Sequence, residues 1–260
     1  MIRFLLIFFL AFTAPASAQN AAEELGGLLR SLHLDPAFRQ SLRDRGYTGQ
    51  KFDIMVDHTR KLYADKAIIS GIVRKIDAGL RVSGNKPSRA FFDQLDTALS
   101  QAYSIGVTRL SAAERKRMFA TDFGFIKALP SRDCTRMMTG KLRGDRGGEL
   151  FDSYMVQLPA KNIADYHALA RKATRLGLAA NASRRNLSAA DVRRVEEALF
   201  PRIDDLIGKQ PNAKALYKAW AKGPTASGRY KCTFNLLFGS AALGLQGKTG
   251  DLTILYLLTQ

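Results

Sequence analysis

The two cysteines are the first residues whose chemistry depends on where they lie in the chain. Cys134 is found in the segment RDCTRMMTGKL, and Cys232 begins the segment CTFNLLFGSAALGL. Cysteine metal sites need closely spaced ligand pairs, which this spacing lacks, and neither cysteine has neighbours that mark an activated nucleophile. In an oxidising compartment two thiols usually pair. We therefore predict a Cys134–Cys232 disulfide, with two buried free thiols as the alternative.

Residues 1–18 have the pattern of a secretory signal peptide, which is the reason to expect an oxidising compartment. They contain Arg3, the apolar stretch FLLIFFLAFTA, and Ala16-Ser17-Ala18 before Gln19. The apolar stretch of about eleven residues is shorter than the roughly 20 that a membrane-spanning helix needs. We therefore expect an exported protein, periplasmic or secreted, that is not transmembrane after cleavage.

The chain has a large excess of positive charge, which indicates the kind of partner it binds. Lysine and arginine outnumber aspartate and glutamate by 40 to 23, and the formal net charge is +17. Self-repulsion of this size favours acidic partners. For an exported protein the candidates are lipopolysaccharide, an anionic lipid, a cell-wall polymer or another envelope protein, whereas nucleic acid is not expected in that location. The alternative is a solvated basic surface without a ligand.

Two groups of basic residues are dense enough to bind an anion. The first surrounds Cys134 and consists of Arg132, Arg136, Lys141, Arg143 and Arg146, and the second includes Arg171, Lys172, Arg175, Arg184 and Arg185, followed by Arg193 and Arg194. Arg171 and Arg175 are four residues apart in a predicted helix, so they share a face. Several guanidinium groups could converge there on a phosphate or a carboxylate. We predict the anion-binding site at Arg171, Lys172, Arg175, Arg184 and Arg185.

The residues that usually perform acid–base catalysis form no recognisable motif. His33, His58 and His167 lack metal-ligand spacing, and the acidic neighbours of the last two lie on other faces of their predicted helices. The sequence also has no nucleophile elbow, phosphate-binding loop or dinucleotide fingerprint. We therefore predict no catalytic residue, no metal site and no cofactor, and we interpret the chain as a non-enzymatic binding protein.

A cell-envelope (peptidoglycan) hydrolase is the alternative. Glycan hydrolysis needs two carboxylates that flank a cleft, and distant helices could supply them. The candidate acids are Glu114, Glu149 and Glu196, although Glu114 also fits a capping role and Glu196 a solvated helix face. In that case the basic surface would hold the enzyme on an anionic cell-wall polymer.

Helical periodicity dominates the chain after residue 18 and predicts an all-α fold, an irregular multi-helix bundle of about 9–11 helices. A long helix is expected over residues 51–80, where Ile69, Ile72, Val73 and Ile76 recur on one face. The glycine-rich segment TGKLRGDRGGEL predicts a hinge near residues 140–148. Residues 19–260 are therefore interpreted as one α-helical domain with two sub-bundles.

Local signals indicate two helix boundaries and the type of the last element. Ser111 and Glu114 form a capping box at the start of a helix. Pro201 is expected to kink or end the helix in which it lies, because its ring clashes with the preceding turn. Residues 251–260 fit either a helix or a strand, and we choose a helix because the rest of the chain is helical.

Overall fold

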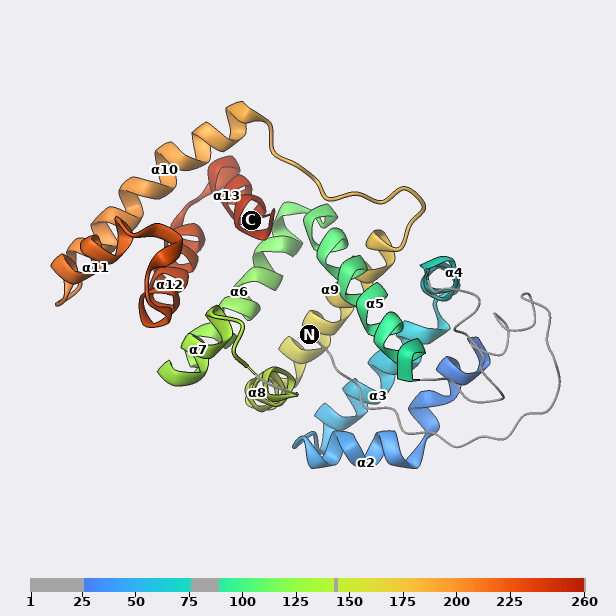
Figure 1. The fold of residues 1–260 in the computed structure, drawn as a ribbon. Coiled ribbons are helices and arrows are strands. Elements are labelled where there is room, and N and C mark those ends of the chain that lie inside the picture. Colours follow the sequence, from blue (N-terminus) through green and yellow to red (C-terminus); the bar gives the residue numbers. More distant parts are fainter. Residues whose placement is uncertain (1–25, 76–88, 143–144, 260) are drawn as a thin grey trace. The chain divides into compact units, whose positions relative to one another are not determined.

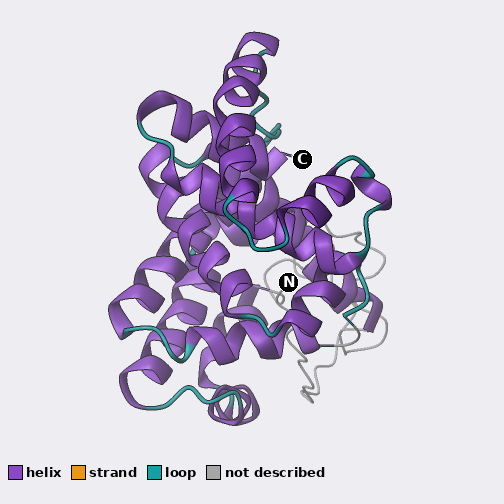
Figure 2. Ribbon diagram, turned by 90° about the vertical axis from the view of Figure 1, so that its left-hand side faces the viewer, coloured by secondary structure: helices purple, strands orange, loops and turns teal. Residues whose placement is uncertain are grey.

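The structure, a computed structural model, describes residues 26–75, 89–142 and 145–259. The predicted signal peptide and Ile76 lie outside these residues, as does Arg143. Every regular element that the described residues form is a helix, as Figure 2 shows, and the all-α prediction is confirmed. None of the helices in this part of the chain is long and apolar enough to cross a bilayer.

The contacts within the chain divide it into two compact units. The first unit consists of Met1–Leu110 and Asp152–Arg184, and the second consists of Ser111–Phe151 and Arg185–Gln260. Each unit is therefore assembled from two separate stretches of sequence. The hinge predicted near residues 140–148 stays a prediction.

The first unit is organised around helix α9. Its elements are a helix at residues 26–31, the short 3-10 helix η1 (Leu32–Leu34), α2 (Pro36–Asp44), α3 (Gly49–Ala64), α4 (Lys66–Lys75), α5 (Arg89–Arg109), the last part of α8 (Arg146–Met155) and α9 (Ala160–Gly177). Helix α9 packs against α5, α3 and α4, and Figure 1 shows it running beside α5. The segment that closes this unit in sequence is thus central to it in space.

The helix expected over residues 51–80 is divided into α3 and α4. Asp65 has an extended backbone at the division, and its Oδ1 accepts a hydrogen bond from the backbone N–H of Ala67 at 2.9 Å. A short polar side chain that caps the next N–H groups favours the start of a new helix. Of the predicted stripe, Ile72 is buried and Ile69 and Val73 are partly buried, while Ile68, which was not part of that stripe, is fully buried. The described residues form thirteen α-helices, somewhat more than the 9–11 expected from the sequence.

Helices α5 and α9 approach until their backbones touch. Gly106 of α5 faces the backbone of Ala173, and Gly177 of α9 faces the backbone of Ala102. A Cβ atom at either glycine would overlap a carbonyl oxygen of the other helix. Glycine is therefore required at both positions, because side chains set the distance between packed helices.

The second unit has its core along one face of α10. Its elements are α6 (Ala112–Ala128), α7 (Ser131–Met138), the first part of α8, α10 (Ala189–Gly208), α11 (Ala213–Trp220), the 3-10 helix η3 (Gly223–Thr225), α12 (Gly228–Gly244) and α13 (Gly247–Thr259). The buried stripe of α10 consists of Val195, Leu199, Ile203 and Ile207, and it packs with Leu216 of α11 and Leu237 and Ala241 of α12. A spacing of four residues keeps such a stripe on one helix face. Residues 251–259 belong to α13 and are helical, as chosen from the sequence.

Local signals predicted the start of α6 correctly, and of the two outcomes expected at Pro201, a kink or an end, the end does not occur. The capping box at the start of α6 is present, with Ser111 Oγ accepting from the backbone N–H of Glu114 and Glu114 Oε2 accepting from that of Ser111. Helix α10 does not end at Pro201 and continues to Gly208. Pro201 is exposed, so water can reach the carbonyl group that loses its partner one turn earlier. The buried stripe on both sides of the proline favours a continuous helix.

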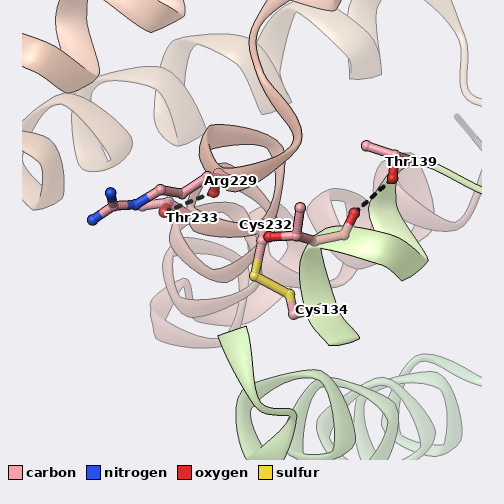
Figure 3. The surroundings of a disulfide bond; sticks show 6 residues. Cys134, Thr139, Arg229, Cys232 and Thr233 are labelled. Atoms are coloured by element: carbon pink, nitrogen blue, oxygen red, sulfur yellow. Dashed lines mark hydrogen bonds between the residues drawn. A yellow bond between two sulfur atoms is a disulfide. The ribbon is translucent and has the colours of Figure 1, made fainter. Parts of the chain in front are cut away.

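The predicted disulfide between Cys134 and Cys232 is present and joins α7 to α12 (Figure 3). The two Cα atoms are 5.8 Å apart, and both cysteines are buried. Gly228 at the start of α12 lies against the methyl groups of Thr135 and Thr139, so the helices are also in close contact beside the bond. The disulfide therefore fixes α7 on α12 and links the two stretches of sequence that form the second unit.

Candidate anion-binding surfaces and a buried histidine pair

Helix α9 presents an exposed face that includes two residues of the predicted anion-binding site. Ala168, Lys172 and Arg175 are all exposed. Residues three or four positions apart lie on the same side of a helix. Lys172 and Arg175 therefore share one solvent-facing side of α9.

Arg171 is directed away from that exposed face. Its side chain is partly buried, and Nη1 lies 2.9 Å from Nδ1 of His58 on α3. Burial lowers the pKa of Arg171, and the carboxylate of Asp57 acts in the opposite direction. A guanidinium group keeps its charge in proteins. Arg171 thus places a positive charge at the contact between α3 and α9 and not on the face that Lys172 occupies.

The remaining two residues of the predicted site belong to different units. Arg184, in the first unit, donates from Nη2 to Oγ of Ser104 at 2.7 Å. Arg109 at the end of α5 donates from Nη1 to the carbonyl oxygen of Ser183 at 3.3 Å, so the segment after α9 is held on α5. Arg185 belongs to the second unit. Of the five residues, Lys172 and Arg175 share one exposed face of α9, and the anion-binding role of the set stays a prediction.

Helix α7 in the second unit carries another pair of arginines from the basic groups. Arg132 and Arg136 are four residues apart and exposed, and neither has an ion-pair partner among the described residues. Arg146, from the same basic group, pairs with Asp133 at 3.7 Å. Because Cys134 lies between the two exposed arginines and is bonded to α12, their helix is held in place. We call Arg132 and Arg136 the α7 arginine pair.

Two histidines that are far apart in sequence pack together where α3 meets α9. The ring centroids of His58 and His167 are 4.4 Å apart, and the residues are only 7% and 4% exposed. Both ring nitrogens of His167 are buried without a hydrogen-bond partner in the described part of the chain. Each unpartnered buried polar group of this kind costs about 1–3 kcal/mol. The pair therefore contains two unpartnered ring nitrogens that are buried beside the charge of Arg171.

Burial keeps both imidazoles neutral near pH 7. It lowers the pKa of His167 to about 4, and the positive charge of Arg171 acts in the same direction. The pKa of His58 lies well below its ordinary value because of burial and of the charges that His167 and Arg171 can carry. Neutral imidazoles can be metal ligands, but the described residues contain no group of three or more His, Cys, Asp or Glu side chains suited to hold a metal ion.

The contact between His58 and His167 was not predicted from the sequence, where each histidine was assessed separately. The available signal was periodicity. Met55 and His58 are both on the buried face of α3, and Ile163, His167 and Ala170 are on that of α9. This spacing could have predicted that both rings are buried. It could not have predicted that they meet, because the two helices are brought together only by the packing of the unit.

The acids considered for glycan hydrolysis have mainly local contacts. Glu114 belongs to the capping box of α6, and Glu149 pairs with Arg146 at 3.1 Å. Glu196 is partly exposed on α10. A glycosidase needs two carboxyl groups that face each other across a cleft. The contacts of Glu114 and Glu149 give these carboxylates structural roles, so they lend no support to the hydrolase alternative.

Asp152 has a mostly buried carboxyl group and was not among the residues predicted from the sequence. Its Oδ1 accepts a hydrogen bond from the hydroxyl of Tyr47 at 2.9 Å, and its Oδ2 lies 3.3 Å from Nη1 of Arg45. Burial raises the pKa of Asp152, while Tyr47 and Arg45 oppose that effect. Both carboxylate oxygens are occupied, so Asp152 links α8 to the segment before α3 inside the first unit.

Comparison with known proteins adds no assignment to this geometry. No protein-family model matches the chain, and no curated protein or solved structure matches it significantly. The charge, burial and contacts of the chain's own residues are therefore the basis for assigning a function.

Proposed function

We propose that the chain is an exported, disulfide-bonded helical protein that binds an anionic component of the cell envelope through exposed arginine and lysine side chains. The observation that carries the proposal is the α7 arginine pair, two exposed guanidinium groups without ion-pair partners on a helix fixed by a disulfide. Guanidinium groups bind phosphates and carboxylates through paired hydrogen bonds, and a rigid support reduces the entropy lost on binding.

The disulfide supports the exported location. Disulfides persist in oxidising compartments and are rare in the cytosol, where thiols are kept reduced. Cys134 and Cys232 are the only cysteines of the chain, and they are bonded to each other. Together with the signal-peptide pattern of residues 1–18, this favours a periplasmic or secreted protein.

The charge of the chain supports an anionic partner. Its formal net charge of +17 is spread over both units, and exposed cations such as Lys172 and Arg175 add to the α7 arginine pair. A single exposed ion pair contributes only about 0–1 kcal/mol, so binding requires several contacts and should weaken with salt. Lipopolysaccharide, anionic lipid and cell-wall polymer all offer repeated phosphate or carboxylate groups. An acidic face of another envelope protein is the remaining partner class.

Retention on envelope materials tests the binding proposal. The mature protein would be incubated with lipopolysaccharide, anionic lipid vesicles and cell-wall sacculi at about 0.02 M and about 0.5 M salt, where the Debye lengths differ about fivefold. We expect retention on at least one material at low salt and its loss at high salt. The double variant Arg132→Gln/Arg136→Gln should be retained several-fold less.

A charge-matched control separates this pair from net charge alone. Arg60 and Lys61 are exposed, but both already pair with Asp57 at 2.6 Å. Arg60→Gln/Lys61→Gln removes the same formal charge and should leave retention nearly unchanged. Equal losses in the two double variants would remove the α7 arginine pair from the proposal, and no salt-sensitive retention of the native protein on any material would reject anionic binding altogether.

A separate measurement tests export. The secreted product should begin after Ala18 and should contain no free thiol when it is denatured without reduction. A product that stays in the cytosol, or that shows two free thiols per chain, would contradict the exported part of the proposal.

A further inference from the structure

Four aromatic side chains form a cluster between α10, α11 and α12 of the second unit. The ring of Trp220 stacks on Phe238 with centroids 5.6 Å apart, and it meets Phe234 edge-on at 5.2 Å and Phe200 edge-on at 6.4 Å. In Figure 1, α11 lies along the end of α10 and beside α12. Trp220 therefore joins the end of α11 to both neighbouring helices.

Two side chains of this cluster are exposed to solvent, and so is the neighbouring Tyr217. Trp220 is 36% exposed, Phe200 is 41% exposed, and Tyr217 on α11 is also 41% exposed. Among the described residues the large hydrophobic side chains with exposure this high are these three and Leu34. Exposed apolar residues are common when scattered singly, whereas a group of them indicates an interaction surface.

Lysines accompany the exposed aromatic residues along α11. Lys214 and Lys218 are four residues apart, and Lys222 follows after the same interval. All three are exposed, and none has an ion-pair partner in the part of the chain that the structure describes. On α10, Asp205 pairs with Lys209 at 2.6 Å, whereas Asp204 accepts a hydrogen bond at 2.9 Å from the hydroxyl of Tyr217, a neutral donor that does not balance a carboxylate charge.

Acidic residues do occur on α10 near this surface. Glu196 and Glu197 lie one helical turn before Phe200, and Arg193 lies one turn before Glu197. The charge along α10 is therefore mixed. Lys214 and Lys218 lie on α11, the helix that also carries Tyr217 and Trp220. Lys222 follows two residues after that helix ends.

We propose that Phe200, Tyr217 and Trp220, together with Lys214, Lys218 and Lys222, form a surface that docks on an anionic lipid bilayer. We call these six residues the aromatic–lysine surface. The inference rests on the proposed function and names a lipid bilayer as the anionic partner. Amphipathic aromatic rings favour the boundary between head groups and acyl chains, whereas lysines extend their ammonium groups to the head groups.

Charge complementarity is the reason to choose a bilayer with anionic lipids over an apolar protein groove. Each lysine near an anionic membrane surface contributes about fivefold to binding, so three contribute about 100-fold. The aromatic rings alone would bind a neutral membrane interface weakly. The lysines alone would bind the head groups without inserting any side chain towards the acyl chains. The combination is typical of proteins that lie on a membrane without crossing it.

Trp220 is the only tryptophan of the chain and lies in the proposed contact, so its fluorescence reports on docking directly. The mature protein would be titrated with vesicles of phosphatidylglycerol and phosphatidylcholine, and with vesicles of phosphatidylcholine alone. We expect a blue shift of the Trp220 emission with the anionic vesicles only, and quenching when those vesicles contain lipids brominated high on the acyl chain.

Variants at exposed positions test the two parts of the surface. Lys214→Gln/Lys218→Gln/Lys222→Gln should lower vesicle affinity about 100-fold. Phe200→Ser keeps the tryptophan probe and should weaken both the shift and the quenching. Arg60→Gln/Lys61→Gln/Lys161→Gln is the matched control, because these three exposed cations pair with Asp57 or Asp165 and removing them changes the net charge equally.

The possible results separate this inference from the proposed function. Sedimentation with anionic vesicles without any change in Trp220 emission would overturn the aromatic–lysine surface but leave anionic binding intact. Retention on sacculi or lipopolysaccharide without vesicle binding would likewise overturn only the choice of a lipid bilayer as the partner. Equal affinity of both triple variants, or equal binding to neutral vesicles, would overturn the role of the lysines. No retention on any anionic material would reject the inference and the proposed function together.

Discussion

Acidification should destabilise the protein through the buried pair of His58 and His167. The unfolded chain binds a proton on His167 near the ordinary pKa of 6.5, whereas burial and Arg171 lower the pKa in the folded protein to about 4. The folded state therefore binds this proton less readily than the unfolded state. The free energy of unfolding should be highest above pH 6.5 and should fall as the pH drops from 6.5 towards 4.

The size of this effect follows from the pKa difference. At about 1.4 kcal/mol for each pH unit, His167 alone should remove about 3 kcal/mol between pH 6.5 and pH 4. His58 acts in the same direction, because burial, His167 and Arg171 also lower its pKa. Since small proteins are stable by only about 5–15 kcal/mol, a loss of this size is easily measured.

The substitution His167→Leu isolates the contribution of this residue. It replaces two unpartnered ring nitrogens by apolar groups, so at pH 7 the variant should be about as stable as the native protein or more stable. Urea unfolding followed by far-UV circular dichroism would be measured at several pH values from 7 to 4. The variant should lose about 3 kcal/mol less than the native protein over this range.

His33 provides a control for this test. His33 lies outside the pair, on the short helix η1, where its Nδ1 is 2.8 Å from the carbonyl oxygen of Arg30. His33→Gln should therefore keep the pH response of the native protein. If His167→Leu lost as much stability between pH 6.5 and 4 as the native protein, the buried neutral imidazole would not be the source of acid sensitivity.

Three further predictions concern the packing, the disulfide and a cap. Gly106→Ala would place a Cβ atom 1.7 Å from the carbonyl oxygen of Ala173 and should lower the free energy of unfolding by at least about 2–3 kcal/mol. Gly147→Ala, with no atom within 4 Å of the added Cβ, should raise it by up to about 1 kcal/mol. Similar urea midpoints for the two variants would argue against the backbone contact. Reducing the disulfide reopens a loop with a sequence separation of 98 residues and should lower the free energy of unfolding by up to about 4–5 kcal/mol; an unchanged midpoint in reductant would contradict this. Ser111→Ala removes the capping bond of α6 and should cost about 1 kcal/mol, while Ser227→Ala at the start of α12, where no side-chain capping bond exists, should cost little; thermal melts of both variants compare them.

Part of the fold followed from local sequence signals. The all-α class, the helix at residues 251–259 and the capping box of Ser111 and Glu114 each depend on residues within a few positions of one another. Such signals act before any tertiary contact forms, so they can be read from the chain. The Cys134–Cys232 bond was also predictable, because a chain with only two cysteines allows a single intramolecular pairing.

Other local signals were outweighed by their surroundings. Pro201 is a strong helix breaker, yet α10 continues through it because the proline faces solvent while the residues on either side bury one apolar stripe. Asp65 carries a capping signal that divides an otherwise continuous periodicity into α3 and α4. In both cases the sequence contains two opposing preferences. The burial of the apolar stripe prevails at Pro201, whereas the local cap prevails at Asp65.

The helical fold class, the charge excess and the positions of the candidate cations can be read from the amino-acid sequence. Which side chains meet, such as Arg171 with His58, the two histidines with each other, and Trp220 with Phe200, depends on how the helices pack. The difference comes from the distance along the chain over which each effect acts. Periodicity and capping depend on the backbone within one or two turns, whereas the partner of a side chain depends on which distant helix buries the same face.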